Sequence, residues 1–135
     1  MKAILINAET QTVEQVDIPE NKHLETYYAL LKCDCVTVVE IAVQRNHSLY
    51  LDDEALLTDS HQYGFSILGQ EFVGNGLIVG YNPDEGEDVD VDVRVTPQYI
   101  TGLVQFLDRS QIDDEPRIEF YSWDDLEGMK KAKEN

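Results

Sequence analysis

The sequence predicts an α+β fold in which a mainly antiparallel sheet is built from hairpins and two amphipathic helices pack on one face. Three observations predict this fold. Valine alternates with a charged residue from 88 to 95, as in a strand with one buried face. Residues 21–32 and 96–108 repeat apolar side chains with helical spacing. Turn-forming residues separate the short β-branched runs.

The chain has 135 residues, which fits one domain spanning residues 1–135. No linker, internal repeat or low-complexity tract divides it. We expect an acidic extension from about residue 109, and a basic tail at 130–135 that frays.

Residues 1–18 predict a β-hairpin. Residues 1–6 form a short apolar strand, and residues 11–18 alternate valine and isoleucine with polar side chains. The link at 7–10 is rich in residues that favour turns. Pro19 ends the second strand, because proline donates no backbone hydrogen bond.

Residues 21–32 predict an amphipathic helix. Asn21 is the expected N-cap, and Glu25 lies near the positive end of the helix. The apolar stripe predicts a core face, with the alternative that its tyrosine pair lines a pocket. This stripe contains Leu24, Tyr27, Tyr28 and Leu31.

Residues 35–51 predict a second pair of strands. Residues 35–44 are dense in β-branched side chains, which favours a central strand. Residues 45–48 are expected to form a polar turn, and a returning strand begins at Leu49 and ends at Asp52. Residues 54–63 indicate one helical turn followed by a polar loop. Cys33 and Cys35 lie at the start of the first strand, at the edge of disulfide reach, and reduced thiols are expected.

Residues 69–95 predict the organising hairpin. The outgoing strand is expected at 72–81, with three glycines, at 74, 76 and 80, on one face, which indicates close approach by a helix or a ligand. Residues 82–86 form the turn, closed by Gly86 in a left-handed conformation. On the return strand the valines from Val89 to Val95 are expected to point inward, and the aspartates outward.

Thr96 and Pro97 predict the start of the second helix, as N-cap and first helical residue. Apolar spacing carries this helix to about residue 108. An acidic loop is expected at 111–116, a last strand at 117–123, and a final helix capped by Ser122.

Two segments carry a resemblance to a known family. The first half contributes the MKAILIN start, the TVEQVDI return strand, and a helix ahead of a β-branched strand. The second half contributes FVGNGLIVGYNPDEGE and the helix that begins at Thr96-Pro97. Over residues 1–108 the chain resembles a DUF3846-like family. Its members are short, uncharacterised proteins encoded by phages, plasmids and other mobile elements. The resemblance implies an accessory gene acting on host machinery or defence, and it transfers no catalytic residues.

The composition is strongly acidic. Twenty-seven acidic residues against ten basic ones give a net charge of −17. Direct binding of nucleic acid is excluded, because it requires clustered lysine and arginine. No apolar run approaches the ~18 residues of a membrane span. We expect a soluble, cytoplasmic protein whose acidity either attracts a basic partner or serves solubility alone.

No motif indicates catalysis, a metal or a cofactor. The three histidines, His23, His47 and His61, fall at a helix start and in two polar loops, where exposed side chains are expected. The glycines at 74–80 do not match the dinucleotide-binding spacing, and residues 81–86 do not match a calcium-binding loop. We therefore expect a protein that is not an enzyme.

The first functional hypothesis is a non-enzymatic protein that binds a basic partner through an acidic face. A line of carboxylates along the return strand would resemble the charge track of nucleic acid and attract a DNA-binding groove. Without a partner, the same acids would protect an exposed strand from aggregation. The face contains Asp84, Glu85, Glu87, Asp88, Asp90 and Asp92.

The alternative hypothesis is a small-molecule or nucleotide-binding module, such as a sponge for a defence signal. It would use the bare glycine face, with aromatic and cationic side chains nearby. The residues of this alternative pocket are Tyr27, Tyr28, Arg45, Gly74, Gly76, Arg94 and Arg109. Exposed strand edges would also allow a homodimer.

Overall fold

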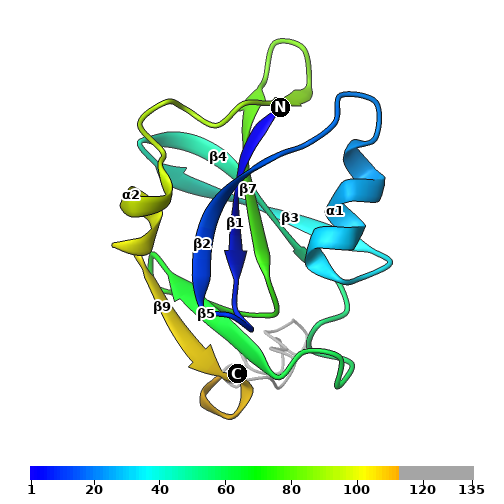
Figure 1. Cartoon of the computed structure of the whole chain (residues 1–135), viewed down its shortest axis with the longest axis vertical. Coiled ribbons are helices and arrows are strands. Elements are labelled where there is room, and N and C mark those ends of the chain that lie inside the picture. The colour runs from blue at the N-terminus through cyan, green and yellow to red at the C-terminus, as the bar shows by residue number, and fades with distance from the viewer. Residues whose placement is uncertain (113–135) are drawn as a thin grey trace, which may run out of the picture.

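The computed structural model describes residues 1–112 as two antiparallel sheets with one helix of two turns and one shorter helix (Figure 1). The large sheet has the strand order β2-β1-β7-β4-β3, and β8 pairs with β7. The small sheet has the order β6-β5-β9. The elements are β1 (Lys2–Asn7), β2 (Thr12–Asp17), α1 (His23–Leu31), β3 (Val36–Val43), β4 (Arg45–Asp52), β5 (Tyr63–Ile67), β6 (Gln70–Val73), β7 (Gly76–Asn82), β8 (Glu87–Val89), α2 (Pro97–Thr101), β9 (Val104–Asp108) and the 3₁₀ turn η1 (Arg109–Gln111). The strand predicted at 117–123, the final helix and the basic tail lie outside the described residues.

The β1–β2 hairpin forms as predicted. The two strands pair in continuous register from Lys2 opposite Asp17 to Asn7 opposite Thr12. The side chain of Asn7 closes the turn, because its Oδ1 accepts hydrogen bonds from the backbone N–H groups of Glu9 and Thr10. The local turn residues therefore favour the reversal of the chain between these two strands.

Each face of the large sheet is covered by different elements. Leu77 and Val79 of β7 point towards α1 and pack with its Tyr27 and Leu31. Ile78 points the other way, into a core that includes side chains of the small sheet and Ile100 of α2. The two helices therefore lie on opposite faces, and the prediction that both pack on one face is wrong. The core between the sheets contains Ile4, Ile6, Ile41, Val43, Leu49, Leu51, Phe65, Ile67, Ile78, Val91, Val95 and Ile100.

The two helices are shorter than predicted. Lys22, not Asn21, is the N-cap of α1, and no side chain caps it. Thr96 caps α2 as predicted by accepting a hydrogen bond from the Tyr99 N–H, and Pro97 is the first helical residue. This helix ends at Thr101, however, and residues 104–108 form β9, paired with β5. Strand pairing outweighs the helical spacing of this segment.

Among the strands of residues 1–112, β3, which was predicted as central, lies at the edge of the large sheet and pairs only with β4. Half of the Val38 surface is exposed there. Gln44, with φ 66°, is the only residue between β3 and β4, so the predicted polar turn at 45–48 is part of β4. His47 is consequently buried rather than exposed.

The organising hairpin is divided between the two sheets. Its predicted outgoing strand breaks after β6, where Gly74 has φ 92°, and the chain re-enters the large sheet as β7. Gly86 closes the next turn with φ 67°, as predicted. The return strand β8 is only three residues long, after which the chain leaves β7. Val91 and Val95 are buried, but Val93 is 91% exposed, so its predicted inward orientation is wrong.

The glycine face of β7 is filled by the protein itself. A Cβ atom on Gly76 would lie 2.6 Å from Cζ of Phe65 in the small sheet. A Cβ atom on Gly80 would overlap the carbonyl oxygen of Asp90, where the chain crosses β7. These glycines therefore permit close packing of a strand and a loop, rather than of the helix that was expected.

Candidate functional site

The six acidic residues of the predicted face do not form a straight row. Glu85, Glu87 and Asp90 are exposed, as is Asp84, whereas Asp88 and Asp92 are half-buried. Because β8 ends at Val89, strand spacing does not extend to the later aspartates. The structure instead assigns these side chains to three different environments.

Asp88 joins α1, β4 and β8. Its Oδ2 atom accepts hydrogen bonds from the hydroxyl groups of Tyr27, at 2.8 Å, and Tyr50, at 2.9 Å. The two rings are in contact, with centroids 4.7 Å apart. Burial, and then the hydrogen bond to Asp88, raises the pKa of each tyrosine, so both phenols remain protonated donors. Asp88 therefore connects the β7–β8 hairpin to α1 and β4.

Asp92 is neutralised by two arginines. Its carboxylate accepts hydrogen bonds from Nε of Arg94 at 2.9 Å and from Nε of Arg45 at 3.2 Å. The hydrogen bonds from Arg94 hold the pKa of Asp92 well below its usual range. The backbone N–H of Asp92 also donates to Nε2 of buried His47, whose Nδ1 then donates to the carbonyl oxygen of Arg45. This fixes His47 as the neutral tautomer.

His47 is expected to make the fold more sensitive to acid. Burial lowers its pKa below the ordinary value of 6.5, so the unfolded chain binds a proton more readily than the folded one. The contribution of neutral His47 to the free energy of unfolding is fully present above pH 6.5, and it decreases as the pH falls towards the lowered pKa. In urea titrations between pH 7.5 and 5.5, His47→Gln should show a shallower loss of unfolding free energy than wild type. The difference is at most about 1.4 kcal/mol per pH unit. Equal slopes would contradict the prediction, and His23→Gln is the control.

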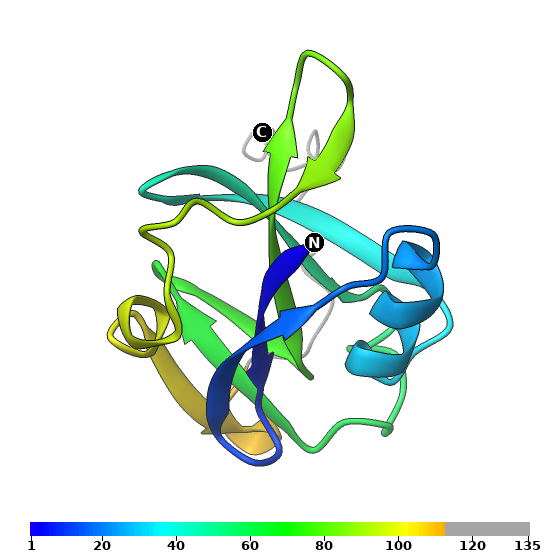
Figure 2. The ribbon, with the colours of Figure 1, turned by 45° about the horizontal axis from the view of Figure 1, so that its top comes forward.

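The β7–β8 hairpin projects from the rest of the molecule (Figure 2). Of the remaining acidic residues, Glu87 and Asp90 line a hollow at the base of this hairpin. Glu20, which follows β2, and Glu87, Asp88 and Asp90 line this hollow of about 390 Å³ together with Met1. The pKa of Glu87 is raised by a hydrogen bond with Glu85 and by its charge. Its side chain therefore lies in a field of net negative charge, although the Met1 ammonium, 3.8 Å from the Glu20 carboxylate, lines the same hollow.

The residues of the alternative pocket are not brought together. Tyr27 binds Asp88, whereas Arg45 and Arg94 bind Asp92. Tyr28 is half-buried on α1, and Phe65 occupies the space beside Gly76. Arg45 does border a groove of about 610 Å³ with Tyr50 and Tyr81, but neither glycine lines that groove.

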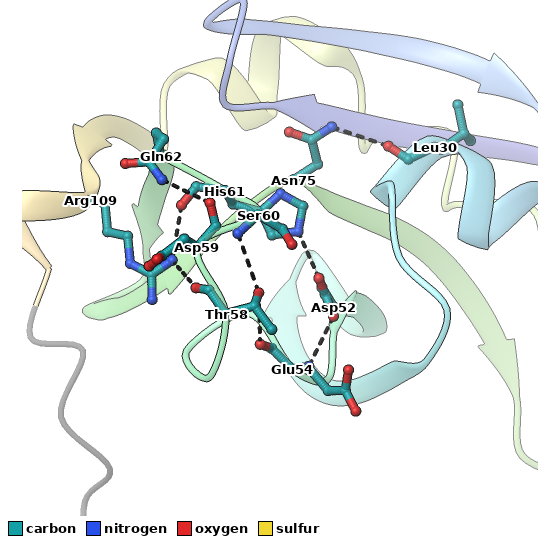
Figure 3. A network of polar contacts seen from close by, with 10 residues as sticks. All are labelled: Leu30, Asp52, Glu54, Thr58, Asp59, Ser60, His61, Gln62, Asn75 and Arg109. Atoms are coloured by element: carbon teal, nitrogen blue, oxygen red, sulfur yellow. Dashed lines mark hydrogen bonds and ion pairs between the residues drawn. The ribbon is translucent and has the colours of Figure 1, made fainter.

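A second constellation, missed from the sequence, lies at the opposite end of the large sheet (Figure 3). Nε2 of His61 is 2.7 Å from Oδ2 of Asp52, the last residue of β4. The two side chains are only 9% and 8% exposed, so the prediction of an exposed His61 is wrong. The other carboxylate oxygen of Asp52 accepts the backbone N–H of Glu54 at 2.9 Å. Nothing in the local sequence signals this pairing across nine positions.

The His61 ring lines a cavity of about 270 Å³ between the β1–β2 turn, α1 and the start of β7. The ring packs against Gly74, whose missing Cβ would lie 3.2 Å from Cδ2 of His61. Buried Asn75 supports the wall by accepting from the Ala8 N–H and donating to the carbonyl oxygen of Leu30. The cavity is lined by Ala8, Glu9, Lys32, Ser60, His61, Gln62, Tyr63, Gly74 and Asn75.

Arg109 braces the loop that carries His61. Its guanidinium donates to the carbonyl oxygens of Thr58 at 2.6 Å and His61 at 3.0 Å (Figure 3). Ile112 is buried with Leu107, so the chain after residue 109 still belongs to the fold as far as it is described. Arg109 therefore has a structural role and lies away from the other residues of the alternative pocket.

None of the helices in residues 1–112 has the length and hydropathy of a membrane span.

Sequence comparison places this chain in a family. Comparisons with curated proteins and with solved structures give no significant match. The family model described as "Domain of unknown function (DUF3846)" matches residues 1–103, which is well over half of the sequence. The chain therefore belongs to the DUF3846 family.

Proposed function

We propose that this protein binds a basic partner protein through the acidic face formed by Glu20, Asp84, Glu85, Glu87 and Asp90, in the mobile-element setting that the sequence resemblance implies. The observation that carries the proposal is the hollow at the base of the projecting hairpin. There, carboxylates from two segments distant in sequence, Glu20 and residues 87–90, line one depression. A lysine or arginine side chain of a partner fits a depression of this charge.

The charge of the whole molecule supports the same function. A net charge of −17 produces a long-range field that accelerates encounter with a cationic surface and weakens with added salt. Asp88 and Asp92 are removed from the binding set, because tyrosines and arginines of this chain already engage them. The proposal rests on charge density and not on the regular spacing of a nucleic-acid backbone, which the short β8 does not provide.

Binding of a fluorescent octalysine peptide, measured by anisotropy, tests the proposal. The triple variant Glu85→Gln/Glu87→Gln/Asp90→Asn should bind the peptide about tenfold more weakly at low salt, because two charges that line the hollow and the charge of Glu85 beside Glu87 are lost. The matched control Glu14→Gln/Asp17→Asn/Glu71→Gln removes the same charge from exposed positions on β2 and β6. It should weaken binding only slightly.

The comparison of the two variants decides between a local face and a general charge effect. Equal weakening by both triple variants would show that the peptide responds only to net charge and would overturn the proposal. Binding that does not weaken between low and physiological salt would also overturn it, since exposed charges are screened there.

A further inference from the structure

We propose that Asp52 and His61 form a general acid–base pair that hydrolyses small uncharged carboxylic esters in the cavity beside Gly74. This activity goes beyond the proposed binding function and uses a different part of the molecule. It rests on the buried pairing of the two side chains and on the cavity that the histidine lines.

The pairing fixes which nitrogen of His61 can act as a base. The carboxylate of Asp52 accepts from Nε2, so the proton of the neutral ring lies on Nε2. The lone pair then lies on Nδ1, which is not the atom engaged by Asp52. Two further hydrogen bonds hold the pair in place. The Glu54 N–H donates to the Asp52 carboxylate, and the Arg109 guanidinium donates to the carbonyl oxygen of His61. A base held by a buried carboxylate beside a cavity is the arrangement that general base catalysis requires.

The cavity selects small and uncharged substrates. Its volume of about 270 Å³ admits only a small molecule. Glu9 lines it, Asp52 lies behind His61, and the charge of the whole protein is negative, so phosphate esters and other anions are repelled. The ammonium of Lys32, 2.9 Å from the Glu9 carboxylate, lines the same cavity and can stabilise negative charge that develops on a carbonyl oxygen.

Water is the nucleophile in this reaction. Burial raises the pKa of the neighbouring Cys33 thiol to about 11, so that thiol stays protonated at neutral pH and is a poor nucleophile. Ser60 lines the cavity, but its hydroxyl forms no hydrogen bond with His61. Nδ1 of His61 takes a proton from water as the oxygen attacks the ester carbonyl. The resulting imidazolium returns that proton to the departing alkoxide, so one ester and one water give one acid and one alcohol.

Hydrolysis of p-nitrophenyl acetate by the full chain tests the proposal. The rate per molecule of protein should exceed that of an equal concentration of free imidazole by about a hundredfold or more. His61→Gln should abolish the excess, and Asp52→Asn should reduce it at least tenfold, since a carboxamide can still accept from Nε2 but stabilises the imidazolium less. His23→Gln, which removes a histidine from α1, should leave the rate unchanged.

Two results would overturn the proposal. A wild-type rate no greater than that of free imidazole would show that the pair serves only to anchor the loop at 53–62. An excess rate that survives His61→Gln in a folded protein, verified by circular dichroism, would place the reaction elsewhere. The Asp52→Asn variant keeps the assay informative if His61→Gln does not fold. The acidic-face triple variant should retain the esterase rate, so this proposal and the binding function can fail independently.

Discussion

Phe65→Ala is expected to lower the free energy of unfolding by about 3–5 kcal/mol. Phe65 is fully buried in the core between the two sheets, and its ring occupies the space that Gly76 leaves by having no side chain. The neighbouring backbone belongs to paired strands and cannot collapse into the cavity. The cost therefore includes both the lost burial of the ring and the cavity that remains.

Urea denaturation at neutral pH, followed by far-UV circular dichroism, measures this effect. Phe72→Ala is the matched control: its ring lies 5.6 Å from that of Phe65, centroid to centroid, but it is only partly buried. Phe72→Ala should lower the free energy of unfolding clearly less than Phe65→Ala. Gly76→Ala should also destabilise wild type, and less so in a Phe65→Leu background, because the shorter side chain relieves the contact. Equal losses for Phe65→Ala and Phe72→Ala would contradict the proposed packing.

Asp88→Ala is expected to lower the free energy of unfolding by about 2–4 kcal/mol. The substitution leaves the hydroxyl groups of Tyr27 and Tyr50 without their common acceptor at a partly buried site. It also removes the link between α1, β4 and β8. Most surface carboxylates cost far less on removal, so the size of the loss distinguishes Asp88 from the exposed acids around it.

Removing the hydroxyl groups isolates the cause. In the Asp88→Ala background, Tyr27→Phe/Tyr50→Phe should restore part of the lost stability, because no unsatisfied donor remains. In the wild-type background the same double substitution should destabilise the protein, because it removes the two hydroxyl groups that donate to the Asp88 carboxylate. Asp84→Ala, on the exposed turn of the same hairpin, is the control and should change the unfolding free energy little. If Asp88→Ala behaves like Asp84→Ala, the tyrosines do not depend on the carboxylate.

The parts of the fold that the sequence predicts correctly depend on local chemistry. The Asn7 turn, the left-handed Gly86 and the Thr96 cap each follow from a side chain and its immediate neighbours. The alternating faces of β7 likewise follow from a period of two residues. Such features carry their own signal, because the stabilising contact lies within a few residues.

The errors arise where distant pairing decides the structure. Residues 104–108 have helical spacing, yet β5 offers them a complete strand partner. Val93 continues an alternating pattern, but the chain has already left β7 at Val89. His47 lies in a polar sequence, yet it is buried because β4 begins earlier than the turn residues suggest.

The candidate site shows the same limit. The acidic composition of the hairpin is evident from sequence, but the choice between exposed and engaged carboxylates depends on Tyr27, Tyr50 and the arginines, which come from other elements. The contribution of Glu20 to the hollow could not be predicted, since it follows β2. The pair of Asp52 and His61 requires the end of β4 and the braced loop to be in place first.

The sheet order also constrains how the chain acquires its structure during synthesis. The second neighbour of β1 is β7, so the N-terminal hairpin has an unsatisfied edge until residues 76–78 are available. Only Gly74 and Asn75 separate β7 from β6, so assembly of one sheet positions the strand that begins the other. Such late closure of distant strands favours slow folding and a single cooperative transition. A ribosome-bound chain that ends before β7 should therefore remain susceptible to proteolysis throughout, with no independently folded N-terminal unit.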